Sequence, residues 1–329
     1  MRESLRQSAR DSVINLDKPP SLTSYDAVDE IKRLLGIRKV GHAGSLDPFA
    51  TGVLLVCTER ATKVTRFLME LEKGYTGTIR LGSETDTDDS TGEVTSETGD
   101  FDVSRDELSR AAASFTGSIL QRPPRVSALK RNGRRFYEMA RRGEDFEPEA
   151  RSVTIYEFVI TAFRTPDVEF SLKCSRGTYV RSVARDLGRL LGCGGHLGEL
   201  RRTRVGQFAV EESVTLERFE EALGLPREAD GLPTGPGPGG RIPGLWSLDE
   251  ALGFLPGCFL RDEVVGSVLD GRSPRLDEFE RMDERAAQGG RVRVMSRDGR
   301  LIAVGMVAAG GAESVVKLER VLARKSEPE

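Results

Sequence analysis

The sequence predicts an α+β protein with two domains. At 329 residues the chain exceeds the length at which one hydrophobic core keeps growing. Alternating segments joined by turns predict antiparallel hairpins, and apolar residues at helical spacing predict helices between them. Residues 224–242 are rich in Gly and Pro and indicate a linker. We therefore expect a disordered extension at 1–12, a larger domain at 13–223 and a small β-rich domain at 243–325.

The first part of the larger domain shows clear local signals. Thr23 or Ser24 caps a predicted helix at 24–35, and Gly36 stops it. A second amphipathic helix is predicted at 62–71. We expect strands at 13–16, 53–57 and 76–81, with Tyr75 at the entrance of the third.

The rest of the chain continues this alternation. Ser104 and Glu107 form a capping box for a helix that ends before Gly117. A hairpin is predicted at 152–163 and 168–174, followed by a helix at 178–191 that holds Tyr179 and Arg181 in its first turn. In the small domain, Asp298-Gly299 predicts a hairpin over 291–304, and 314–322 predicts a further strand.

A glycine-rich stretch at 41–54 contains one of only two histidines, His42, and a constrained carboxylate, Asp47. Glycines permit backbone conformations that other residues avoid, and Pro48 pushes Asp47 towards an extended conformation. The stretch is either a plain surface turn or a rigid turn that aims Asp47 at a ligand. Its own residues leave both interpretations open.

Metal sites find little support in the sequence. The acidic stretch 86–92 fails the EF-hand template because Thr91, not Gly, occupies the sixth position, so we predict a polar loop there. The four cysteines form no C-x-x-C pair, which favours free thiols in a reducing compartment. We expect no metal and no cofactor.

The net charge of -3 hides a local imbalance. Residues 121–142 carry eight basic residues, including Lys130, Arg134 and Arg135, against the single acid Glu138. We call 121–148 the basic insertion, and we expect a projecting loop that either binds a polyanion or is merely a solvated face. A second basic cluster is Arg201, Arg202 and Arg204.

The lengths of the apolar runs in the sequence bear on whether the protein enters a membrane or is exported. No apolar run is long enough to span a bilayer, and residues 1–12 lack the apolar core of a signal peptide. We expect a cytoplasmic protein that does not bind membranes.

Seven short motifs follow one another along the chain. They are Asp17-Lys18-Pro19, Gly41-His42-Ala43-Gly44-Ser45-Leu46-Asp47-Pro48, Lys73-x-Tyr75, Thr85-Asp86-Thr87-Asp88, Ser127-Ala128-Leu129-Lys130, Cys174-Ser175-x-Gly177-Thr178-Tyr179-Val180-Arg181 and Leu200-Arg201-Arg202. In this order, over about residues 12–225, the chain resembles the TruB family of tRNA pseudouridine synthases. The small domain resembles their PUA-like RNA-binding domain.

The resemblance implies a pseudouridine synthase fold, a largely antiparallel sheet flanked by helices, and conversion of uridine 55 in the T arm of tRNA. It implies that Asp47 is the catalytic aspartate, that Arg181 is its partner, and that Tyr75 stacks on the target base. Tyr179 and Leu200 would line the base pocket. His42 would fill the space left by the flipped nucleotide, and Lys18 would support the Asp47 loop or contact substrate. Val126 replaces the tyrosine that family members often carry before Ser-Ala-Leu-Lys.

Two other functions fit the same motifs. One is a guide-RNA-dependent pseudouridine synthase, although the long basic insertion resembles stand-alone enzymes. The other is a non-catalytic RNA-binding protein, which would need no Asp47, Tyr75 and Arg181 set. We expect a monomer that acts on the T stem-loop of tRNA without a guide RNA.

Overall fold

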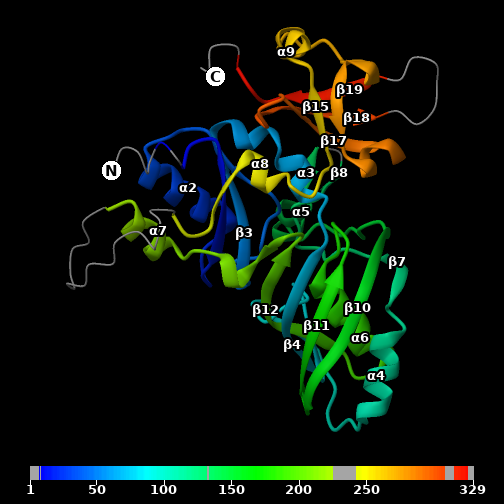
Figure 1. The fold of residues 1–329 in the computed structure, drawn as a ribbon. Helices are drawn as coiled ribbons and strands as arrows, with labels where there is room; N and C mark the ends of the chain where they lie inside the picture. Colours follow the sequence, from blue (N-terminus) through cyan, green and yellow to red (C-terminus); the bar gives the residue numbers. More distant parts are fainter. Residues whose placement is uncertain (1–6, 8, 132, 225–241, 308–314, 325–329) are drawn as a thin grey trace.

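The computed structural model describes residues 7, 9–131, 133–224, 242–307 and 315–324. Figure 1 shows two bodies, a large one built around a long twisted sheet and a smaller one packed against its end. Residues 225–241, which hold nearly all of the predicted linker, lie outside the described residues, as do residues 1–6 and 8 of the predicted extension. No helix in the described ranges is long and apolar enough to cross a membrane.

One large sheet forms the frame of the larger body. The predicted hairpin is confirmed as β10 and β11, which pair antiparallel from Ile155 with Cys174 to Arg164 with Asp167. Among the described strands, β12 and β3 make the one parallel pair of this sheet. In spatial order the strands are β14 (Leu245–Ser247), β1 (Ser12–Lys18), β3 (Thr51–Thr58), β12 (Gly195–Val205), β4 (Lys73–Leu81), β11 (Asp167–Cys174), β10 (Arg151–Arg164) and β7 (Gly117–Gln121). Two short strands, β2 (Val40–His42) and β13 (Phe208–Ala209), pair with β3 and β12.

Apolar clusters lie on both faces of this sheet near β1 and β3, and helices cover both. Of the two predicted caps, Thr23 opens α2 (Ser24–Leu35), in a capping box with Asp26, and the predicted capping box at Ser104 opens α4 (Arg105–Ala113). Helix α6 (Val180–Leu190) packs on β12, and α7 (Leu216–Ala222) contacts α2 and β1. Behind α4, Phe158 of β10 lies edge-on to both Phe115 and Phe170, at 6.1 and 5.8 Å between ring centroids.

Three expectations from the sequence are wrong in detail. The predicted helix 62–71 is a 3-10 turn, η1 (Glu59–Lys63), followed by a short α3 (Thr65–Met69). Tyr75 lies inside β4 rather than at its entrance. Residues 9–12 belong to the fold and not to a disordered extension, since Ala9 is fully buried and Ser12 begins β1.

The smaller body is a five-stranded sheet with short helices, which agrees with the predicted β-rich domain. Its hairpin turns at Asp298-Gly299 as predicted, with Gly299 at a φ of 88°. Parallel pairing joins β15 to β17. The strands in order are β16 (Phe279–Met282), β15 (Gly257–Leu260), β17 (Gly290–Met295), β18 (Leu301–Val307) and β19 (Val316–Val321), and the remaining elements are α9 (Asp262–Leu269), η3 (Leu276–Glu278) and η4 (Glu284–Gln288).

The predicted boundary at residue 243 is too early. Strand β14 pairs with β1 of the large sheet, and Trp246 packs edge-on against Phe208, with ring centroids 4.8 Å apart. Together with the short helix α8 (Leu248–Ala251), this segment belongs to the larger body, so the small sheet begins at β15.

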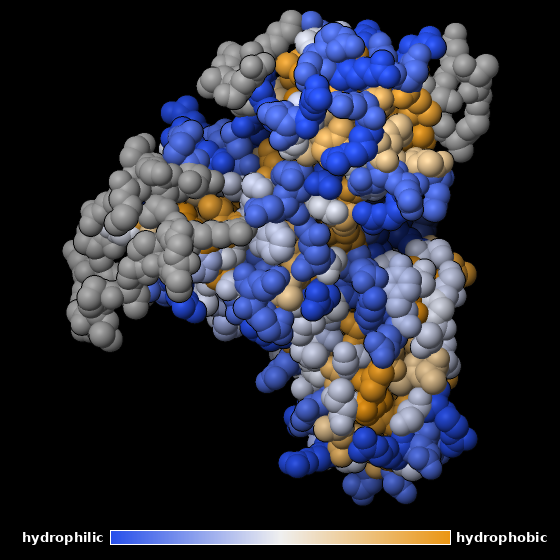
Figure 2. All heavy atoms as spheres, in the orientation of Figure 1, coloured by the Kyte–Doolittle hydropathy of each residue, from blue (hydrophilic) through white to orange (hydrophobic). Residues whose placement is uncertain are grey.

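The two bodies share a packed interface. Arg291 contacts both Glu70 and Glu319, at 2.5 and 2.6 Å, and its guanidinium lies over Phe67. Lys63 donates to the carbonyl of Val321. Figure 2 shows hydrophilic residues over much of both bodies in this view, with apolar residues in smaller patches between them.

Candidate active site

The loop that carries Asp47, residues 43–50, joins β2 to β3. Ser24 of α2 fixes its middle, because the Ser24 hydroxyl accepts from the Leu46 amide at 2.9 Å and donates to the Leu46 carbonyl at 3.1 Å. Glycine is required at position 52, where φ is 96° and a Cβ would lie 2.2 Å from the Arg202 carbonyl oxygen. The loop is therefore the rigid turn that its glycines suggested.

Lys18 supports this loop from inside the protein. Its side chain is fully buried, and Nζ donates to the carbonyls of Pro19, Leu22 and Pro48 at 2.8, 2.7 and 3.1 Å. Burial lowers the pKa of Lys18 to about 8. Of the two roles considered for Lys18, the structure supports the bracing of the Asp47 loop.

Arg202 is a second internal brace, which the sequence did not reveal. It is 2% exposed, and it donates to the carbonyls of Val53, Ser45 and Gly44 at 2.7, 3.3 and 3.1 Å. None of the carboxylates in the described part of the chain forms an ion pair with it. Within the second basic cluster, Arg202 is therefore internal, Arg201 pairs with Asp17 at 2.8 Å, and Arg204 is exposed.

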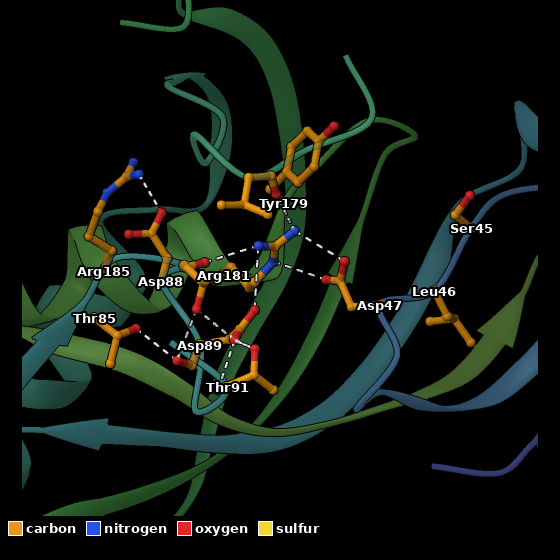
Figure 3. A network of polar contacts seen from close by, with 12 residues as sticks. Ser45, Leu46, Asp47, Thr85, Asp88, Asp89, Thr91, Tyr179, Arg181 and Arg185 are labelled. Atoms are coloured by element: carbon orange, nitrogen blue, oxygen red, sulfur yellow. Dashed lines mark hydrogen bonds and ion pairs between the residues drawn. The ribbon is translucent and has the colours of Figure 1, made fainter. Parts of the chain in front are cut away.

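Asp47 and Arg181 form the central ion pair (Figure 3). Nε of Arg181 lies 2.9 Å from Oδ2 of Asp47, and Nη2 donates to Oδ1 at 3.1 Å. The Arg181 side chain is 5% exposed, whereas 36% of the Asp47 side chain is exposed. The arginine is therefore fixed from behind, and the carboxylate keeps an open side for a ligand.

The environment acts on the Asp47 carboxyl group in two directions. Desolvation raises its pKa above the ordinary value for aspartate, and the nearby Asp89 carboxylate adds to this. Arg181 and Lys18 work against the rise. The sequence suggested only the effect of the arginine, and the structure adds the opposing and larger effect of burial.

An acidic loop at residues 85–91 holds the other side of Arg181. Nη1 of Arg181 lies 3.4 Å from the Asp89 carboxylate and donates to the Thr87 carbonyl at 2.9 Å. Asp89 is 3% exposed and accepts from the hydroxyls of Thr87 and Thr91 at 2.8 and 2.5 Å. Figure 3 shows Arg181 between Asp47 and Asp89.

The neighbouring Asp88 pairs with Arg185, one turn further along α6, at 2.7 Å. The polar loop predicted at 86–92 is present. The prediction did not include the ion pairs that its Asp88 and Asp89 form with the arginines of α6. The alternation of Thr and Asp, which favours local side-chain hydrogen bonds, was the available signal. Among the described residues no group of three or more His, Cys, Asp or Glu side chains could hold a metal ion.

The predicted base-pocket residues come from three elements, and Leu200 lines a second pocket beside Phe49 rather than the cleft of Asp47 and Arg181. Tyr75 of β4 and Leu200 of β12 are buried, each 8% exposed, on neighbouring strands. Tyr179 is the N-cap residue of α6. Burial raises the pKa of both tyrosines, and Asp47 is near enough to add to each shift.

His42 lies at the end of β2, next to the Asp47 loop. Burial lowers its pKa, and its Nδ1 is buried without a hydrogen-bond partner. A buried polar atom without a partner is rare in proteins. This is consistent with the predicted position of His42 beside the substrate.

A cleft of about 1100 Å³ lies in front of the ion pair. Asp47 and Arg181 open into it between the acidic loop and the basic insertion. The insertion is not a plain loop, because it contains a hairpin of β8 (Lys130–Arg131) and β9 (Arg134–Arg135), the helix α5 (Phe136–Arg141), and a small core of its own.

The charge of the insertion is partly neutralised by its own end. Arg134 donates to the Glu144 carboxylate at 3.0 Å, and Arg125 lies 3.4 Å from Asp145. Arg122 pairs with Glu147. Lys130 and Arg135 are exposed, and the guanidinium of Arg135 lies 5.7 Å from the ring centroid of Tyr137.

Comparison with known proteins gives a consistent result. Residues 32–180 match the profile described as TruB family pseudouridylate synthase (N terminal domain), and residues 181–232 match that of the tRNA pseudouridylate synthase B C-terminal domain. The second match begins in α6 and so covers part of the large sheet rather than the small domain.

Relatives over nearly the whole chain include tRNA pseudouridine synthase B of Burkholderia pseudomallei (strain 668), which is 40% identical over 97% of this chain and 99% of its own length. The protein of the same name from Syntrophobacter fumaroxidans is 41% identical over 91% of this chain and 94% of its own. Among solved structures, the crystal structure of a Cbf5-Nop10-Gar1 complex matches with a TM-score of 0.75 and 27% identity, over 97% of this chain and 87% of that one.

Proposed function

Since the chain belongs to the TruB family of pseudouridylate synthases, we propose that it converts a uridine of tRNA, at position 55 in the T arm, to pseudouridine. The observation that carries this proposal is the pair of Asp47 and Arg181 at the wall of a large cleft, with the carboxylate open to that cleft and the arginine held from behind. The basic insertion borders the same cleft.

The chemistry of the isomerisation fits these residue types. The bond from N1 of uracil to C1′ of the ribose breaks, the base turns, and a bond from C5 to C1′ forms. C5 loses a proton and N1 gains one, so the reaction needs no oxidant, reductant or energy donor. A carboxylate aimed at the ribose and base is suited to assist it, either as a nucleophile at C1′ or C6 or by taking a proton from the ribose.

The target base has to leave its stack to reach Asp47, which costs a few kcal/mol. We infer that Tyr75 is the aromatic platform that offsets part of this cost, with Leu200 and Tyr179 as the walls of the pocket. Tyr179 could also take the proton from C5. His42, whose Nδ1 is unpaired and buried, would contact the RNA near the flipped nucleotide.

Contacts with the RNA backbone would come from the basic insertion. Lys130 and Arg135 are exposed, and Arg134 is available once Glu144 gives way to a phosphate. The PUA-like small domain is docked against α3 and η1, which would hold a second RNA-binding surface in a fixed place relative to Asp47. We propose that the protein acts as a monomer in the cytoplasm.

Guide-dependent synthesis is the rival with structural support, because the similar solved chains come from a Cbf5-Nop10-Gar1 complex and from an H/ACA RNP bound to a substrate RNA. The stand-alone enzyme is favoured by 40% identity to tRNA pseudouridine synthase B over nearly the full length. An ordered basic insertion that could grip RNA without protein partners points the same way. A non-catalytic RNA-binding role would not explain why Asp89 and the Thr87 carbonyl hold the buried Arg181 against Asp47.

The test uses the purified protein and an unmodified T stem-loop transcript. We expect pseudouridine at position 55 without added RNA or protein. A requirement for a guide RNA would support the rival, and product at another uridine would refute the assignment of position 55. The Asp47→Asn variant should bind the stem-loop within a few-fold of the wild type but form no product. If no pseudouridine forms under any condition, the proposed function is wrong.

A further inference from the structure

The stem of the basic insertion is bonded to the first turns of α6. The insertion leaves the sheet at Gln121 and returns at Arg151, which are register partners in β7 and β10. The next residue after Gln121 is Arg122. Its carbonyl accepts from two side chains of α6, Ser182 Oγ and Arg185 Nη2, both at 2.9 Å. These bonds join a segment that would contact RNA to the helix that carries Arg181.

The closest bond in this connection is made by Gln121. Its Oε1 accepts from the amide of Tyr179 at 2.8 Å, and its Nε2 donates to the carbonyl of Tyr179 at 3.1 Å. Gln121 is 2% exposed. One amide side chain therefore bonds both backbone groups of Tyr179, and the Tyr179 carbonyl also accepts from the Val183 amide at 3.2 Å.

Tyr179 needs such a partner because of its position. It is the N-cap residue of α6, with extended backbone angles of -98° and 109°, and its side chain makes no capping hydrogen bond. The Tyr179 amide is thus held from outside the helix, by Gln121. Arg181 follows two residues later and donates to the carbonyl of Val126, on the same stem.

We propose that Gln121 is a positioning residue that aligns Tyr179 and Arg181 with Asp47 and couples the basic insertion to the active site. This inference rests on the proposed function. RNA that binds the insertion would pull on its stem, and the bonds of Gln121 and Val126 would pass that constraint to Tyr179 and Arg181. Because the Val126 contact is made by its carbonyl, the absence of a tyrosine at that position leaves it intact.

The first variant removes both bonds while keeping the shape of the side chain. For Gln121→Met we expect the affinity for the T stem-loop to stay within about twofold, because the exposed basic residues are unchanged. The single-turnover rate should fall about tenfold or more, since small misplacements of reacting groups are costly. The matched control is Gln207→Met, because Gln207 donates to the Glu250 carbonyl at 2.8 Å far from the site. It should keep the wild-type rate.

A second variant provides a readout that a purely structural role would not move. In Gln121→Glu, the ionised carboxylate can accept from the Tyr179 amide but cannot donate to its carbonyl. Protonation makes the side chain an analogue of glutamine that can do both. The rate of this variant relative to the wild type at the same pH should therefore rise as the pH falls, while Gln121→Met shows no such rise.

Each outcome has a clear meaning. A wild-type rate in Gln121→Met, or a pH-independent ratio in Gln121→Glu, would overturn the inference while leaving the proposed function intact. Failure of the wild type to form pseudouridine would overturn the proposed function and this inference with it. Should Gln121→Met not fold, Ser182→Ala removes one stem bond, and it should lower the rate without weakening binding; an unchanged rate would count against the coupling.

Discussion

Replacing Arg181 by lysine tests the arrangement of the active site most directly. The guanidinium reaches Asp47, Asp89 and two backbone carbonyls, those of Thr87 and Val126, at 2.9 to 3.4 Å. It does so because its nitrogens form a planar fork. A lysine ammonium keeps the charge, but its donors leave from a single atom, so it cannot span both carboxylates.

The size of the effect follows from burial. Asp89 is 3% exposed, and breaking a buried ion pair costs about 3–5 kcal/mol. Since lysine keeps one positive charge in place, we take the lower end, about 3 kcal/mol. If this loss falls on the alignment of Asp47 in the transition state, the rate decreases about 100-fold or more, at about 1.4 kcal/mol per factor of ten.

The assay is single-turnover pseudouridine formation on the T stem-loop with saturating protein, alongside the RNA affinity and the thermal unfolding curve. The matched control is Arg189→Lys on the same helix. Arg189 makes a fork-like contact with Glu84 at 2.8 and 2.7 Å, but 58% of its side chain is exposed, so its pair is worth less than about 1 kcal/mol. A rate for Arg181→Lys within about threefold of the wild type, or an equal loss in Arg189→Lys, would refute the reasoning.

Three further predictions concern pH, salt and backbone strain. Because burial raises the pKa of Asp47, its carboxyl group takes up a proton earlier as the pH falls, so kcat/KM should decline with a midpoint above the ordinary value of about 3.9; a lower midpoint in folded protein would contradict this. Arg135→Gln should reduce the slope of log affinity against log salt by about 0.7–0.9. Arg134→Gln should reduce it by less, because Glu144 already neutralises Arg134. If neither slope changes, the insertion is a solvated face that does not contact the RNA backbone. Gly52→Ala should destabilise the fold and slow the reaction, whereas Gly41→Ala, with nothing within 4 Å of the added Cβ, should be close to neutral in denaturant unfolding and in activity.

Local signals predicted most of the secondary structure. The capping boxes at Thr23 and Ser104, the stop at Gly36 and the turn at Asp298-Gly299 are all present where the residue types required them. Each depends on bonds between residues a few positions apart, so the sequence contains the whole cause. The helix predicted at 62–71 rested on apolar spacing alone, and the structure divides it into η1 and α3.

The boundary of the small domain could not be predicted in the same way. Residues 245–247 look like the start of a new β-rich unit, but they pair with β1, which lies more than two hundred residues earlier. The sequence of a three-residue strand does not specify which sheet edge the strand will pair with. That choice depends on the free edge of β1 and on the ring of Phe208 that receives Trp246.

By itself the sequence determined a turn at Asp47, without deciding between a plain and a rigid one, and its motif order indicated the family. Only the tertiary structure decided what that carboxylate faces. Arg181, 134 residues away, meets Asp47 because β12 lies between β3 and β4 and seats α6 behind the cleft. The same packing buries Arg202 beneath the loop and brings Asp89 against Arg181. Burial and ion pairing are long-range properties of the assembled sheet, so residue types that read as surface charge in the sequence became the internal support of the site.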